Sequence, residues 1–145
     1  MKPHATATWR GSARAGEGTI HTISGVFNNS IFTQGTSLMG LPCTNPGEIL
    51  AAAEASCMSM MIAKELDKEG IIPDEIEVTS EVLLAPEDEG WNIPHIKLTV
   101  KAFIPEIERR KFEALVKRAK EHCPITRSLK SNVTVEALVE TAVHA

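Results

Sequence analysis

The sequence lacks the features that mark nucleic-acid-binding and membrane-spanning proteins. Its net charge is −4 and its lysines are interspersed with glutamates, so it offers no basic stripe to a phosphate backbone. No apolar run approaches the roughly 20 residues that span a bilayer, and the N-terminal residues 1–4 lead into no apolar signal core. We therefore expect a cytoplasmic protein that acts on small molecules, with no nucleic-acid or membrane partner.

Cysteines are also scarce, with three in 145 residues, and their odd number argues against a disulfide framework. In a reducing compartment such thiols are reactive, metal-ligating or simply buried. No pair of cysteines or histidines has the short spacing of a zinc site, so metal ligation is disfavoured. A serine hydrolase is disfavoured too, because the Gly-x-Ser-x-Gly elbow is missing. The reactivity of the thiols is therefore the main functional question.

The pattern of elements indicates an α+β fold in a single domain, residues 1–145, whose 43% hydrophobic content is enough to build a core. Short β-rich pieces separated by glycine or asparagine predict a meander of hairpins over residues 5–42. Two segments of alternating polarity predict antiparallel strands joined by a turn at 86–90. A last strand is expected over 133–140.

A long helix is predicted from Pro46 to about Lys68, because Thr44 or Asn45 can cap the free backbone amides and proline fits the first helical position. Gly70 should end it. The helix is apolar nearly all round, and a helix without a polar face must be buried on most sides. We therefore place it at the centre of the fold or of a dimer.

Two cysteines occupy positions where reactivity depends on the neighbours. Cys57 lies in the middle of the apolar helix, which by itself raises a thiol pKa, so an inert core cysteine and a thiolate activated by a cation are both open. Cys123 lies on the buried stripe of a second, amphipathic helix that begins after Pro105. It precedes Pro124, where a new helix start could offer amides to a thiolate, and a packing role is equally open.

Two segments resemble the OsmC/Ohr family of osmotically inducible and organic-hydroperoxide-resistance proteins: residues 44–57, TNPGEILAAAEASC, and residues 123–129, CPITRSL. The order of the expected elements matches the family along nearly the whole chain. The resemblance implies an OsmC-like fold, with antiparallel sheets around a buried central helix, and an intertwined homodimer with active sites at its interface. A central helix too apolar to face solvent agrees with such a dimer.

The same resemblance implies a thiol-dependent peroxidase that reduces organic hydroperoxides and hydrogen peroxide. Cys57 matches the peroxidatic thiolate, which attacks the O–O bond and becomes a sulfenic acid. Cys123 matches the resolving thiol, which condenses with it to a disulfide. An external dithiol then reduces the disulfide, and the chemistry needs no metal, haem or flavin cofactor.

The family's arginine and glutamate, which polarise the thiolate and the peroxide, are absent from their usual OsmC positions. This chain has Ser37 and Gly47 there, which keeps open an alternative: an OsmC-like redox-sensing or small-ligand-binding protein with weak or no peroxidase activity. A purely structural dimer with unreactive cysteines is a third possibility. Cys43 has no counterpart in the motif, and we expect a spectator thiol, with an alternative resolving residue as the other possibility.

Other residues can replace the altered pair. The Ohr branch takes its arginine from the first hairpin turn, where this chain has Arg14, with Arg10 as the second choice. Glu48 is adjacent to the lost glutamate, and Glu54 lies one helical turn from Cys57 on the same side of the helix. We expect Arg14 to pair with one of these carboxylates and to lower the Cys57 pKa, and a solvated turn residue is the open alternative for Arg14. A structural pair across the dimer is the open alternative for Glu54.

Overall fold

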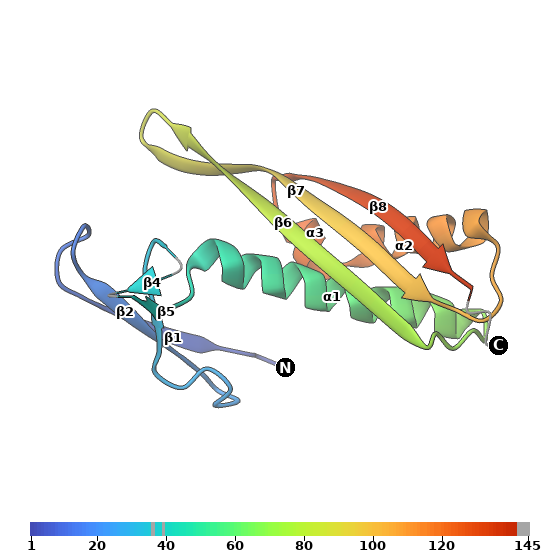
Figure 1. The fold of residues 1–145 in the computed structure, drawn as a ribbon, viewed down its shortest axis with the longest axis horizontal. Coiled ribbons are helices and arrows are strands. Elements are labelled where there is room, and N and C mark those ends of the chain that lie inside the picture. The colour runs from blue at the N-terminus through green and yellow to red at the C-terminus, as the bar shows by residue number, and fades with distance from the viewer. Residues whose placement is uncertain (36, 39, 142–145) are drawn as a thin grey trace. The chain divides into compact units, whose positions relative to one another are not determined.

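The computed structural model describes residues 1–35, 37–38 and 40–141. Contacts divide the chain into two compact units, and the boundary lies between Ile49 and Leu50, near the start of a long helix. Figure 1 labels the helices and strands of both units. The organisation of the whole chain as one domain stays a prediction.

The first unit is built from short strands, as the hairpin meander predicted. They are β1 (Ala5–Arg10), β2 (Glu17–Thr22), β3 (Ser30–Phe32), β4 (Ser37–Leu38) and β5 (Leu41–Pro42). The first three form an antiparallel sheet in the order β1-β2-β3, and β4 pairs with β5. The first hairpin turn needs a glycine at position 16, because a Cβ on Gly16 would lie 2.5 Å from the carbonyl oxygens of Arg10 and Ser12.

Helix α1 (Pro46–Lys68) begins and ends where the sequence predicts. Asn45 caps it, since its side-chain Oδ1 accepts a hydrogen bond from the backbone N–H of Glu48 at 2.9 Å. At the other end Gly70 adopts φ +69°, the left-handed conformation that glycine tolerates best. The amides of Gly70 and the next residue bond back to carbonyls of the last turn, which closes the helix in a Schellman motif.

Three strands form the sheet of the second unit: β6 (Glu75–Glu87), β7 (Gly90–Phe103) and β8 (Asn132–Glu140), in the order β6-β7-β8. The first two form the predicted antiparallel pair, with a tighter turn than expected, since Glu87 already pairs with Gly90. Strand β8, however, runs parallel to β7. The expectation of antiparallel sheets is therefore wrong for this pair, because a strand that returns through a helical crossover arrives parallel.

Two helices connect β7 to β8 and complete the core: α2 (Arg109–His122) and the short α3 (Pro124–Ser128). Figure 1 shows the sheet of the second unit lying along these helices and α1. Every second residue of β7 from 96 to 102 is fully buried, as is the apolar stripe that was predicted for α2. Cys123, between α2 and α3, belongs to the same core as Met58 of α1.

The two sides of α1 differ in exposure. Its buried residues are Glu54, Met58, Ile62, Glu65 and Leu66. On the other side, Met60 is 71% exposed and follows the exposed Ala52 and Ser56 at helical spacing. An intertwined homodimer would cover this stripe, and the dimer stays a prediction. Although α1 has 23 residues, the described part of the chain contains no helix with the length and apolar character of a membrane span.

Candidate active site

The structure brings the two predicted reactive cysteines together in the second unit. Helix α1 carries Cys57 in its middle, and Cys123 is the residue between α2 and α3. The Cys123 thiol donates a hydrogen bond to the Cys57 sulfur, and the two Sγ atoms lie 3.0 Å apart. Both thiols are free, with Cys57 half-buried and Cys123 buried. A disulfide, with its S–S bond of about 2.05 Å, requires the sulfur atoms to approach by roughly 1 Å.

The surroundings of Cys57 keep its thiol protonated. The groups of the second unit raise its pKa from an ordinary value of 9.0 to about 11, first by burial and next by its hydrogen bond with Cys123, which keeps the proton on Cys57 once Cys123 is ionised. The Glu54 carboxylate also raises the pKa, whereas the backbone N–H of Ile125 lowers it by hydrogen bonding to the sulfur. No cationic side chain in the described part of the chain contributes to the shift. Activation of this thiol therefore requires a positive charge.

Glu54 is a buried carboxylate one helical turn before Cys57. Its Oε1 accepts a hydrogen bond from the hydroxyl of Thr126 on α3, and its side chain is fully buried. The second oxygen, Oε2, has no hydrogen-bond partner among the described residues. The contact ties α1 to the segment that follows Cys123. Such an intrachain partner was not among the roles that the sequence suggested for Glu54.

A second buried carboxylate, Glu65, lies further along the same face of α1. Its oxygens lie 2.7 Å from Lys68 Nζ, 3.5 Å from His122 Nδ1 and 3.8 Å from Arg118 Nε. The hydrogen bond from Lys68, together with the nearby positive charges, holds the Glu65 pKa below its ordinary range. Sequence reasoning missed this residue. The available signal was its spacing of 11 residues from Glu54, which is close to three helical turns.

Two other predicted site residues lie in the first unit. Arg14 lines a hollow of about 220 Å³ beside Trp9, at the first hairpin turn. Glu48 lies in the first turn of α1, where its carboxylate accepts a hydrogen bond from the Thr44 hydroxyl at 3.2 Å. Both contacts are local to that unit. The pairing of Arg14 with Glu48 or Glu54 stays a prediction.

The remaining residues singled out in the sequence also belong to the first unit. Arg10 ends β1, Ser37 lies in β4, and Gly47 lies in the first turn of α1. Cys43 is half-buried, and its Sγ lies 3.5 Å from the Thr33 hydroxyl. The spectator role expected for Cys43 stays a prediction.

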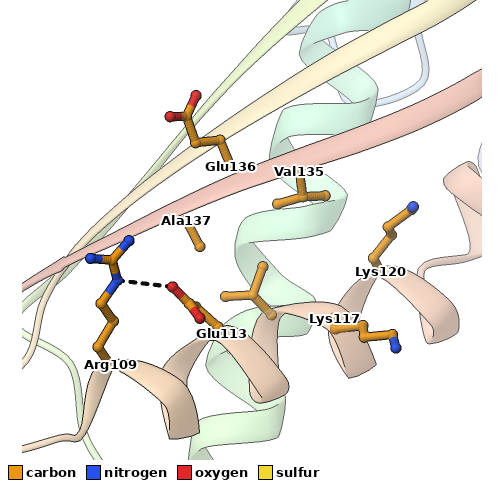
Figure 2. A pocket seen from close by; sticks show the side chains of 8 residues that line it. Arg109, Glu113, Lys117, Lys120, Val135, Glu136 and Ala137 are labelled. Atoms are coloured by element: carbon orange, nitrogen blue, oxygen red, sulfur yellow. Dashed lines mark hydrogen bonds and ion pairs between the residues drawn. The ribbon is translucent and has the colours of Figure 1, made fainter.

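Outside the thiol pair, the second unit has a groove of about 440 Å³ between α2 and β8 (Figure 2). Its lining combines apolar residues such as Val135 with charged ones such as Lys117 and Lys120, and Arg109 Nε pairs with Glu113 at 2.9 Å. None of the predicted site residues lines it. Over the described ranges, no group of three or more His, Cys, Asp or Glu side chains is placed to hold a metal ion.

The chain is similar in sequence and in fold to known proteins. The family model for OsmC-like proteins matches residues 39–137. The chain is 35% identical over 130 residues to the peroxiredoxin OsmC of Escherichia coli strain K12, covering 90% of this chain and 91% of that protein. It is 30% identical over 136 residues to the organic hydroperoxide resistance protein OhrB of Bacillus subtilis strain 168, covering 91% and 96%. A solved OsmC-like protein from Vibrio cholerae shares the fold, with a TM-score of 0.77 at 15% identity over 95% of this chain and 99% of that one.

Proposed function

This chain belongs to the OsmC/Ohr family, and we propose that it reduces hydroperoxides through Cys57 and Cys123. It is a cysteine-based peroxidase and an antioxidant protein, in line with relatives named peroxiredoxin OsmC and organic hydroperoxide resistance protein. The observation that supports these two residues as its redox pair is the 3.0 Å separation of their free thiols.

The proposed cycle has three steps. The Cys57 thiolate attacks an oxygen of the hydroperoxide, so that an S–O bond forms, the O–O bond breaks, and an alcohol leaves after taking a proton. The Cys123 thiolate then attacks the sulfenic sulfur, the S–S bond forms, and hydroxide leaves as water. An external dithiol reduces the disulfide and restores both thiols. With hydrogen peroxide as substrate, water replaces the alcohol, and no step requires a metal, haem or flavin.

The first step needs a cation, because the groups of the second unit alone, burial foremost, raise the Cys57 pKa to about 11. We propose Arg14 as its source, with Glu48 or Glu54 as the carboxylate that orients the guanidinium. A guanidinium stays positively charged at all physiological pH values and stabilises a thiolate. The unpartnered Oε2 of the buried Glu54 supports a role for that residue, because it leaves one acceptor free for an N–H donor.

A homodimer, a dithiol reductant and a cytoplasmic location complete the proposal. The exposed stripe of Ala52, Ser56 and Met60 on α1 supports the dimer, because small and apolar residues allow close packing of a second chain. Three free thiols suit a reducing compartment, where a dithiol is available to reopen the disulfide.

Peroxide consumption by the reduced protein tests the proposal, with cumene hydroperoxide and hydrogen peroxide as substrates and dithiothreitol as the reductant. Cys57→Ser is expected to abolish consumption. Without reductant, Cys123→Ser mixed with one equivalent of peroxide per chain is expected to consume it and to stop as a sulfenic acid. Turnover that survives Cys57→Ser contradicts the proposed function.

A further inference from the structure

The corner formed by Cys123 and Pro124 interrupts the helical hydrogen bonding between α2 and α3. Cys123 has an extended backbone, with φ −68° and ψ 116°, and Pro124 has no amide hydrogen to donate back to α2. The next helical bond, from the Arg127 amide to the Cys123 carbonyl at 3.0 Å, already belongs to α3. Besides the core packing of the fully buried Cys123, side-chain contacts on the two sides of this corner therefore help to set where its sulfur lies.

Two fully buried carboxylates on α1 contact the chain on either side of the corner. Before it, Glu65 Oε1 lies 3.5 Å from His122 Nδ1. After it, Glu54 accepts a hydrogen bond from the Thr126 hydroxyl. The two carboxylates are close to three helical turns apart, so they share one face of α1. Cys57 lies between them in the sequence, and its Sγ is the atom of α1 that the Cys123 Sγ contacts.

We propose that Glu54 and Glu65, here called the carboxylate clamp, are positioning residues that hold the Cys123 thiol against Cys57 for disulfide formation. The inference rests on the proposed function and assigns the clamp to its second step. Both carboxylates are fully buried, which reduces screening of their charges by water, while the His122 side chain that contacts Glu65 is 54% exposed. Each carboxylate with its contact beyond α1 is one arm of the clamp. In the Glu65 arm, Arg118 of α2 adds a second contact, because its Nε lies 3.8 Å from Glu65 Oε2.

The clamp decides between two fates of oxidised Cys57. In one, the Cys123 thiolate attacks the sulfenic sulfur, the S–S bond forms, the S–O bond breaks, and hydroxide leaves as water. In the other, a second hydroperoxide oxidises the sulfenic acid to a sulfinic acid and is itself reduced to an alcohol. A misplacement of about 1 Å can cost on the order of 100-fold in rate. A loosened clamp therefore shifts the product toward sulfinic acid.

Mass spectrometry after mixing with excess cumene hydroperoxide measures the ratio of Cys57 sulfinic acid to disulfide. Glu65→Gln and Thr126→Val each weaken one arm of the clamp, and each is expected to raise this ratio about tenfold or more. Thr126→Ser keeps the hydroxyl and is expected to restore the ratio. Glu113→Gln removes an exposed ion pair on α2 and is the matched control. An unchanged ratio in both arm variants overturns the clamp.

A measurement without peroxide separates a failed clamp from a failed function. Equilibration with reduced and oxidised glutathione measures the stability of the disulfide between Cys57 and Cys123, which depends on how closely the two thiols are held. Glu65→Gln and Thr126→Val are expected to lower this equilibrium constant on the order of tenfold relative to Glu113→Gln. If the protein consumes no peroxide but the two variants still have lower equilibrium constants, the peroxidase proposal is rejected and the clamp is supported. Equal constants reject the clamp, and either arm variant suffices should the other fail to fold.

Discussion

Removal of the Arg14 guanidinium should leave Cys57 at the pKa that its own surroundings set. Those surroundings raise the pKa to about 11. At pH 7 roughly 0.01% of such a thiol is ionised, compared with about 1% of a thiol with the ordinary value of 9.0. Only the thiolate attacks peroxide. If Arg14 brings the pKa of Cys57 to its ordinary value or below, Arg14→Ala should slow the first step at neutral pH by roughly 100-fold or more. The remaining activity should rise about tenfold per pH unit, because the thiolate forms only as the pH approaches 11.

Alkylation with iodoacetamide across a pH range, with the modified residue assigned by peptide mass spectrometry, measures the Cys57 pKa directly. Arg10→Ala is the matched control, because Arg10 lies at the same hairpin and was the second choice from the sequence. The control should titrate like the wild-type protein, whereas Arg14→Ala should titrate near 11. An Arg14→Ala curve that overlays the wild-type curve refutes the assignment of Arg14. A wild-type pKa near 11 refutes the activation of this thiol by any cation.

Three further substitutions test individual contacts. Thr126→Val removes the hydrogen bond to a buried carboxylate and should lower the free energy of unfolding by about 2 kcal/mol, which calorimetry would record as a Tm lower by roughly 4–8 °C. Thr126→Ser should keep most of that stability. The Glu65 pKa is lowered in the folded protein, so the stability that Glu65 contributes is present above its unfolded-state pKa of about 4.3 and is lost as the pH falls through the folded value. The Tm difference between the wild-type protein and Glu65→Gln should therefore shrink on acidification, and a constant difference contradicts this origin. Cys43→Ser should leave peroxide turnover unchanged, because its Sγ contacts the hydroxyl of Thr33 in the first unit; a loss of turnover would instead make Cys43 a reacting thiol.

Local chemistry explains which parts of the fold were predictable. Asn45 and Gly70 fix the ends of α1 through contacts within a few residues, so the sequence shows them directly. The direction of β8 depends on which strand it joins. Alternation within residues 133–140 identifies a buried face and carries no information about the neighbouring strand. Only the crossover through α2 and α3 makes β8 parallel to β7.

The same distinction applies to the site. Burial in an apolar helix raises the pKa of a thiol whatever other elements pack against that helix. The raised pKa of Cys57, caused first by burial, confirms that expectation. Glu54 was recognisable as unusual because it is a carboxylate in an apolar stretch, but its partner Thr126 lies on another helix. Glu65 was missed because it follows Lys64, where charged residues return to the helix and a solvated glutamate is the ordinary expectation. Its burial becomes visible only once α2 packs against α1.

Peptide mapping of the reduced protein after mixing with one equivalent of an organic hydroperoxide tests most directly whether Cys57 and Cys123 form the redox pair. The expected product is a chain in which these two cysteines are joined by a disulfide while Cys43 remains a free thiol. Oxidation centred on Cys43, or loss of peroxide with all three thiols intact, would contradict it.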